Sequence, residues 1–231
     1  MRHLLLLIFF SLTTCLFSQV PRRSYTNVGL QYIQPTDSLK DFIEGGFWGI
    51  NAGTELPVFE SPIEIGFDYS WANFDSKDRD FVLSYYQSIT GQYIYNNATM
   101  RFRNSNNRAL CNIRLKLFNG PFQPYVDLVG GFESYRVSSD IVTAEGGYSA
   151  ATGSNFQYFD ITEVYGWSAG LRVSSNEKLF IDFKIQNLKS GTVNYIDLNT
   201  ITIINGQTIN YTIKEITPKK FVYQVGLSYT Y

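Results

Sequence analysis

An all-β fold, a single antiparallel up-and-down barrel that spans a membrane, is predicted by three features of the sequence. Several stretches alternate strictly between apolar and polar residues, 16% of the 231 residues are aromatic, and no apolar run after residue 18 approaches the ~20 residues of a membrane-spanning helix. A period of two sorts side chains onto the two faces of a strand. Because Tyr and Trp rings favour the boundary between water and lipid, the barrel is predicted to lie in a bilayer.

The N-terminus is predicted to be a signal peptide, residues 1–18, followed by one barrel domain, residues 19–231. Met1 to His3 carry positive charge, the apolar run Leu4 to Phe10 is too short to span a bilayer, and Ser18 offers a small residue for cleavage. The alternative is a lipidation motif ending at Cys15. Cleavage after Ser18 leaves a mature chain with no histidine and one cysteine, Cys111, so we expect an exported protein without an internal disulfide.

The clearest strand lies at the C-terminus, where apolar and aromatic residues alternate with small or polar ones over 219–231. One face is predicted to contact lipid and the other a polar lumen. The same alternation predicts eight strands, near residues 24–34, 45–56, 62–74, 107–118, 123–136, 161–173, 179–188 and 219–231. Their connections are alternately short and long, and the long ones are predicted at 35–44, 75–106, 137–160 and 189–218.

Two long connections contain strand-like sequence of their own. Residues 200–213 surround Asn205-Gly206, a strong hairpin signal, and residues 81–89 and 93–102 form a looser one around Thr90-Gly91-Gln92. Both are predicted to be hairpins that project above the membrane. The alternative, in which the looser hairpin adds two spanning strands, gives a ten-stranded barrel.

Charged residues of both signs fall on the inward face of the predicted strands and are expected to form a structural network that fills the barrel. Glu64 and Asp68 lie two strand steps apart, so a pair that shares a proton or binds a cation is the alternative. Asp75, Asp78 and Asp80 are interpreted as a solvated loop rather than a calcium site. The predicted network comprises Glu64, Asp68, Arg114, Lys116, Asp127, Arg172, Asp182 and Lys184, with Glu133 beside them.

Enzymatic activity is not expected. General base catalysis near neutral pH, catalytic triads and many metal sites depend on histidine, which the mature chain lacks. No metal and no cofactor is predicted, and a net charge of −1 provides no basic surface for nucleic acid. The tryptophans Trp48, Trp71 and Trp167 fall on the outward face, where they are interpreted as interface anchors rather than sugar-stacking platforms, and Cys111 as an inert lipid-facing thiol.

The chain resembles the small outer-membrane β-barrels common in Bacteroidetes-type bacteria, which are similar in shape to eight-stranded barrels of the attachment and structural type. The resemblance depends on Phe17-Ser18-Gln19, on the segment Gly120 to Val126 that leads from a turn into a strand, and on the final aromatic Tyr231. It implies a monomer in the Gram-negative outer membrane, in contact with lipid. It also implies that the barrel-assembly machinery recognises the terminal strand through Tyr223, Leu227, Tyr229 and Tyr231.

The leading functional hypothesis is a non-enzymatic barrel that has a structural role or binds a surface ligand through long external loops. The tyrosines Tyr85, Tyr86, Tyr93, Tyr95 and Tyr148 are expected to carry any such recognition. One alternative is a narrow pore or a transporter of a small or hydrophobic solute, and another is a component of a secretion or assembly machine. The number of strands distinguishes a structural barrel from a pore, because eight strands enclose side chains and little else whereas larger barrels enclose water.

Overall fold

The computed structural model describes residues 24–40, 43, 45–59, 61–87, 90–118, 120–144, 157–176, 178–204 and 208–231. The predicted signal peptide lies outside these residues. No helix among the described residues has the length and apolar character needed to cross a membrane.

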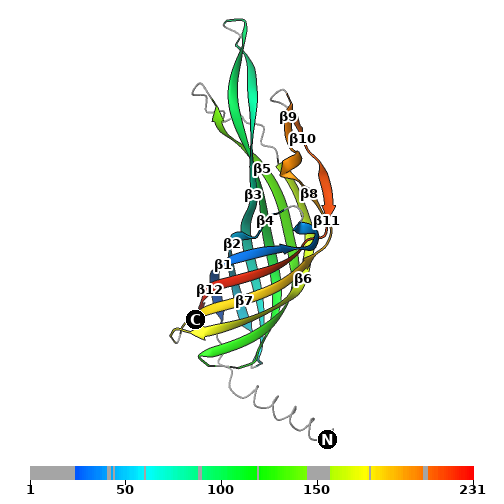
Figure 1. Cartoon of the computed structure of the whole chain (residues 1–231). Coiled ribbons are helices and arrows are strands. Elements are labelled where there is room, and N and C mark those ends of the chain that lie inside the picture. Colours follow the sequence, from blue (N-terminus) through cyan, green and yellow to red (C-terminus); the bar gives the residue numbers. More distant parts are fainter. Residues whose placement is uncertain are drawn as a thin grey trace, which may run out of the picture.

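Eight antiparallel strands close into a barrel, as the sequence predicts (Figure 1). Neighbouring strands follow each other along the chain, and β1 pairs with β12 to close the sheet, with Tyr25 opposite Thr230 and Thr36 opposite Lys219. Closure leaves no free edge within the barrel wall. The eight strands are β1 (Tyr25–Thr36), β2 (Phe47–Pro57), β3 (Ile63–Gln87), β4 (Gln92–Lys116), β5 (Phe122–Ala144), β6 (Gln157–Ser174), β7 (Leu179–Ser190) and β12 (Lys219–Thr230).

The hairpin predicted around residues 81–89 and 93–102 is present, but the strand ends predicted near 74 and 107 are wrong, because β3 and β4 continue through residues 75–106 as one hairpin of two 25-residue strands. A strand needs only about 9–11 residues to cross a bilayer, so 25 residues are far more than a crossing requires. At about 3.3 Å per residue each strand extends about 80 Å. The hairpin projects beyond the barrel, and β5 accompanies it as far as Ala144 (Figure 1). The ten-stranded alternative is therefore wrong, since residues 81–89 and 93–102 lengthen two existing strands rather than adding two to the wall.

The connection between β7 and β12 is an ordered loop. It contains β8 (Val193–Ile196), the 3-10 helix η2 (Leu198–Thr200), β9 (Thr202–Ile204), β10 (Thr208–Asn210) and β11 (Ile213–Ile216). Strand β8 pairs with β11 and β9 pairs with β10, so the hairpin predicted near residues 200–213 is present. Its turn residues, Asn205 and Gly206, lie outside the described residues.

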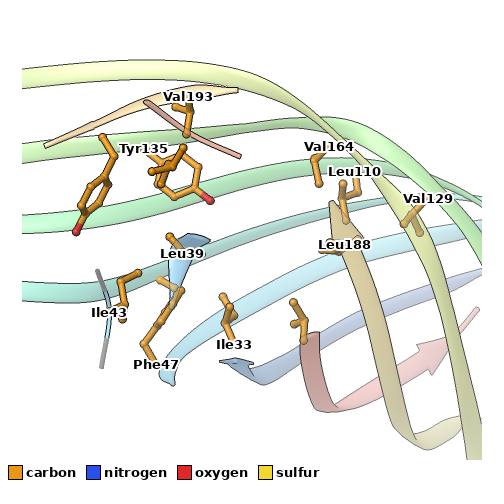
Figure 2. Close-up of a cluster of buried hydrophobic side chains, with 14 residues drawn as sticks. Ile33, Leu39, Ile43, Phe47, Leu110, Val129, Tyr135, Val164, Leu188 and Val193 are labelled. Carbon is orange, nitrogen blue, oxygen red and sulfur yellow. The ribbon is translucent and has the colours of Figure 1, made fainter. Parts of the chain in front are cut away.

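The upper mouth of the barrel is closed by apolar side chains (Figure 2). Leu39 of the 3-10 helix η1 (Asp37–Leu39) and Ile43 enter from the connection between β1 and β2, and Val193 and Tyr195 enter from β8. They meet residues of the wall such as Leu188, whose exposed fraction is 0%. Two connections that the sequence presents as external loops thus fold back to cover the mouth.

A second apolar cluster lies further from the barrel, between the extended sheet of β3, β4 and β5 and the loop that contains β8 to β11. Phe81, Met100 and Phe102 supply the sheet side, and Ile196 and Leu198 supply the loop side. Three backbone carbonyls of the loop hold Arg79 of β3: its guanidinium donates to Ile201 at 2.9 Å and to Leu198 and Asn199 at 3.1 Å. The part of the molecule beyond the barrel therefore has its own core.

Candidate functional site: the barrel interior

Below the apolar mouth, the barrel interior is filled by charged side chains. Among the described residues, six carboxylates and six cations are buried there, and no member exceeds 7% exposure. All eight residues assigned to the interior from the sequence belong to this set, which is Glu55, Glu64, Asp68, Asp127, Glu133 and Asp182 with Arg108, Arg114, Lys116, Arg172, Lys184 and Lys220. The formal charges of these twelve side chains cancel, which is the condition under which so many ions can be buried.

Arg172 is at the centre of the network. Its guanidinium lies 2.8 Å from Glu55, 3.1 Å from Asp182 and 3.5 Å from Glu64. Arg114 makes a two-pronged contact with Asp127, at 2.7 and 3.0 Å, and reaches Glu55 at 3.3 Å. Such planar guanidinium–carboxylate contacts are the strongest kind of side-chain hydrogen bond. Strands β2 to β7 are therefore linked across the lumen by ion pairs.

Tyr125 of β5 supports both arginines from one side. The Arg114 guanidinium lies 3.6 Å from the centre of the Tyr125 ring, and the Tyr125 hydroxyl donates to Asp182 at 2.6 Å. The ring occupies the space in front of its cross-strand partner Gly170, where a Cβ atom would lie 2.3 Å from the ring. A glycine at this position is thus required by the close approach of the aromatic ring.

Glu64 and Asp68, the pair considered for proton sharing or cation binding, each have a cation of their own. Lys116 contacts Glu64 at 2.7 Å, and Lys184 contacts Asp68 at 2.7 Å. Since a lysine already occupies each carboxylate, the geometry matches a structural network rather than a two-carboxylate site. Within the residues that the structure describes, no group of three or more His, Cys, Asp or Glu side chains converges as a metal site would require.

Near the mouth, Lys220 of β12 contacts Glu133 of β5, which also accepts hydrogen bonds from Ser190 and, at 2.9 Å, from Tyr135. Lys220, Glu55 and Arg108 are network members that the sequence-based set omits. Strand phase contained the signal for all three, because each lies an odd number of residues from a position predicted to point outward on the same strand. Beside Asn51 and Gln224 the interior holds a cavity of about 10 Å³, no larger than one water requires.

The residues predicted to face outward do so. Trp48, Trp71 and Trp167 are 66%, 41% and 49% exposed, and Cys111 is also exposed. Tyr223, Leu227, Tyr229 and Tyr231 lie on the outer surface of the closing strand and beyond its end, 40–69% exposed. Interface anchoring and recognition by the assembly machinery stay predictions.

The predicted external residues are placed in part. Tyr93 and Tyr95 are exposed on the projecting hairpin, at 64% and 68%; Tyr148 and the side chains of Tyr85 and Tyr86 lie outside the description. Asp78 and Asp80 point outward from this hairpin and have partners on β4: Arg101 donates to Asp78 at 2.8 and 2.9 Å, and Thr99 donates to Asp80 at 2.8 Å. The acidic residues are thus part of a sheet surface rather than of a loop.

No protein-family model and no curated protein matches this chain in sequence. Among solved structures it is similar to neisserial surface protein A, with 12% identity, 90% of this chain and 97% of that chain covered, and a TM-score of 0.46. It is similar to Ail, the attachment invasion locus protein of Yersinia pestis, with 10% identity, 92% and 100% coverage and a TM-score of 0.46. It is also similar to the outer membrane protease OmpT of Escherichia coli, with 10% identity, 93% and 100% coverage and a TM-score of 0.43.

Proposed function

We propose that this protein is a non-enzymatic β-barrel of the Gram-negative outer membrane that displays a folded platform on the cell surface for structural or recognition purposes. The observation that carries the proposal is an inversion of polarity along the same strands. In the lower part of β3, Phe67, Tyr69 and Trp71 point outward while Glu64 and Asp68 point inward. Further along the same hairpin, charged residues point outward and Phe81 and Phe102 point inward.

The inversion has a simple physical cause. An apolar surface is stable outside a barrel only where the surrounding medium is lipid, and a charged surface is stable where the medium is water. On β4 the switch occurs without any break in the strand, between outward Ile113 and outward Arg103. On β3 a bulge between Asn73 and Asp75 accompanies it and moves the outward positions from odd to even residue numbers.

The surface role is supported by the order of the extracellular part. Its own apolar core and the Arg79 contacts hold the β3–β4 hairpin and the β8–β11 loop together, so Tyr93 and Tyr95 are presented from a folded sheet. Rigid aromatic side chains of this kind bind partners at a low cost in conformational entropy. The non-enzymatic part of the proposal is supported by the interior carboxylates, whose ion pairs and hydrogen bonds hold them in a charge-balanced network.

The first experiment is membrane fractionation of the expressed protein, followed by gel mobility with and without boiling. We expect the protein in the outer-membrane fraction and a mobility shift on boiling, as a closed, detergent-resistant barrel gives. A soluble protein without the shift would contradict the proposal.

Planar-bilayer recordings test the pore alternative. We expect no steady conductance, because ion pairs and the apolar mouth fill the interior. The narrower Bacteroidetes-type resemblance and a role in a secretion or assembly machine stay predictions from the sequence.

A matched pair of substitutions tests the orientation in the membrane. Val225→Arg places a charge in the middle of the apolar outer band, where a barrel in lipid loses about 2–4 kcal/mol. Tyr95→Arg places the same charge on the projecting hairpin, where we expect no loss of folding. Equal tolerance of both substitutions would show that water surrounds both positions.

A further inference from the structure

Two hollows on the outer wall meet at Trp71. The lower one is an apolar groove of about 540 Å³, lined among others by Val28, Ile50 and Ala52. It follows from the small side chain of Ala52, which lies in the sheet between Val28 and Tyr69 and leaves the surface recessed there. The upper hollow, of about 310 Å³, is lined by Trp71 together with Arg103 and Arg136 and with polar residues.

The two arginines of the upper hollow carry incompletely neutralised charge. Arg103 has one long contact, 3.6 Å to Asp140, and both side chains are about half exposed. Arg136 is exposed, and among the described residues its side chain has no ion-pair partner. Arg101, the next outward arginine on β4, differs because Asp78 binds it through two short hydrogen bonds. Two arginines therefore face one aspartate at this hollow. Ser138 lies beside them, as does Ser105, whose hydroxyl donates to the Arg136 carbonyl at 3.4 Å.

The polar hollow with its arginines lies nearer the projecting hairpin than the apolar groove does. A lipid of an outer leaflet has the same order, with its headgroup outermost and its acyl chains below. Trp71 is opposite Asn107 of β4, and Arg103 lies four residues earlier on that strand, about 13 Å nearer the projecting end of the hairpin at 3.3 Å per residue. Arg136 of β5 is opposite Ser105, two residues or about 7 Å from Asn107 in the same direction. Both arginines thus lie on the projecting side of Trp71, and the apolar groove extends from Trp71 in the opposite direction. Arginine forms charge-assisted, two-pronged hydrogen bonds with phosphate.

We propose that this wall binds one phosphorylated lipid of the outer leaflet, with its phosphate between Arg103 and Arg136 and an acyl chain in the groove over Ala52. The proposal depends on the proposed function, because the groove faces lipid only if the barrel is in a membrane. Trp71, at the junction of the two hollows, would contact the lipid where its polar and apolar parts join. The site lies on the outside of the barrel and is independent of the interior network.

The test is native mass spectrometry of the full-length protein in detergent, titrated with bis-phosphorylated lipid A and with phosphatidylcholine. We expect retention of one lipid A and about tenfold weaker binding of phosphatidylcholine. The double variant Arg103→Gln/Arg136→Gln should bind lipid A about tenfold more weakly, since it removes the charge-assisted hydrogen bonds. The control Arg101→Gln removes an already neutralised arginine from the same face and should bind like the unaltered protein. Equal binding by the double variant overturns the proposal.

A second pair of variants tests the groove. Ala52→Phe fills the recess and should weaken lipid A binding, whereas Ala169→Phe, an outward alanine of β6 outside the groove, should leave it unchanged. Displacement of lipid A by millimolar inorganic phosphate would show that the arginines bind free phosphate. A protein that is dimeric, and becomes monomeric in the double variant, would show that this wall binds a second copy of the chain. Either result overturns the lipid assignment. The boiling-dependent mobility shift separates the failures: without the shift the barrel itself is in doubt, and with it only the lipid site is.

Discussion

Strands β3, β4 and β5 belong both to the lower barrel and to the part beyond its mouth, and their polarity is opposite in the two regions. At the level of Glu64 and Arg114 the inward face of β3 and β4 is charged, whereas at the level of Phe81 and Phe102 it is apolar. The lower interior is held by a few strong, directional contacts in which each ion depends on its neighbours. The upper interior is held by close packing of many weak contacts. The two regions should therefore respond differently to the same kind of substitution.

The largest effect is expected where an ion is removed from the lower interior. Arg172→Met leaves Glu55, Glu64 and Asp182 without their common partner, and breaking a buried network in this way costs about 3–5 kcal/mol. The measurement is the urea midpoint of folding into detergent micelles or vesicles, followed by gel mobility. Arg101→Met removes an exposed ion pair and is expected to leave the midpoint unchanged. A loss below about 1 kcal/mol for Arg172→Met would show that water already hydrates the interior.

Truncation in the apolar mouth should have a smaller effect. Leu188 is fully buried in that cluster, and Leu188→Ala should cost about 2–4 kcal/mol through lost burial and the cavity it leaves. The same measurement applies. Leu128→Ala is the control, because Leu128 is 69% exposed on the outer surface and its removal creates no cavity. Equal losses for the two leucines would indicate that the mouth is loosely packed.

Local stability beyond the barrel should depend on Arg79. Arg79→Gln removes the charge-assisted hydrogen bonds to the carbonyls of the 198–201 segment, so we expect the amides of that segment to exchange about tenfold faster with deuterium. The global midpoint should change little, since the loop can open without unfolding the barrel. Unchanged exchange would mean that the apolar contacts of Leu198 alone hold the loop.

The smallest effect is expected from acid on the outer face of the hairpin. The hydrogen bonds from Arg101 lower the pKa of the Asp78 carboxyl below its ordinary value. A carboxyl with a depressed folded-state pKa stabilises the fold above its unfolded pKa of about 3.9, and this contribution is lost as the pH falls through the lower folded value. NMR titration should place the Asp78 midpoint below about 3.9 in the unaltered protein and closer to it in Arg101→Gln. Identical midpoints would contradict the ion pair in solution.

The sequence predicts the eight strands and the inward position of the network residues because a period of two is a local property that neighbours in the chain reveal. Glu55 was within reach of the same reasoning, since it shares the inward phase of Asn51 on β2. The sequence could not predict which of these charged residues form ion pairs with one another. Arg172 meets carboxylates of β2, β3 and β7, and the distance of its partners in the sequence, up to 117 positions for Glu55, leaves no local signal.

The length of β3 and β4 is the clearest difference between the structure and the strands that the sequence pattern predicts. Beyond Asn73 the alternation changes phase at a bulge, and the outward face changes from apolar to polar. Because apolar residues lie outside on the lower part of these strands and inside on the upper part, the sequence pattern is interrupted although the strands are continuous in space. The predicted loop at 75–106 came from that interruption.

The sequence by itself determined the barrel, its strand order and the face on which the side chains of the predicted strands lie, because alternation fixes the face and antiparallel neighbours follow short connections. Only the tertiary structure decided which charges pair, that the loops return to seal the mouth, and that the β3–β4 hairpin and the β8–β11 loop share a core. Those contacts join residues far apart in the chain, and their energies depend on distance and burial in the closed barrel, which no single strand contains.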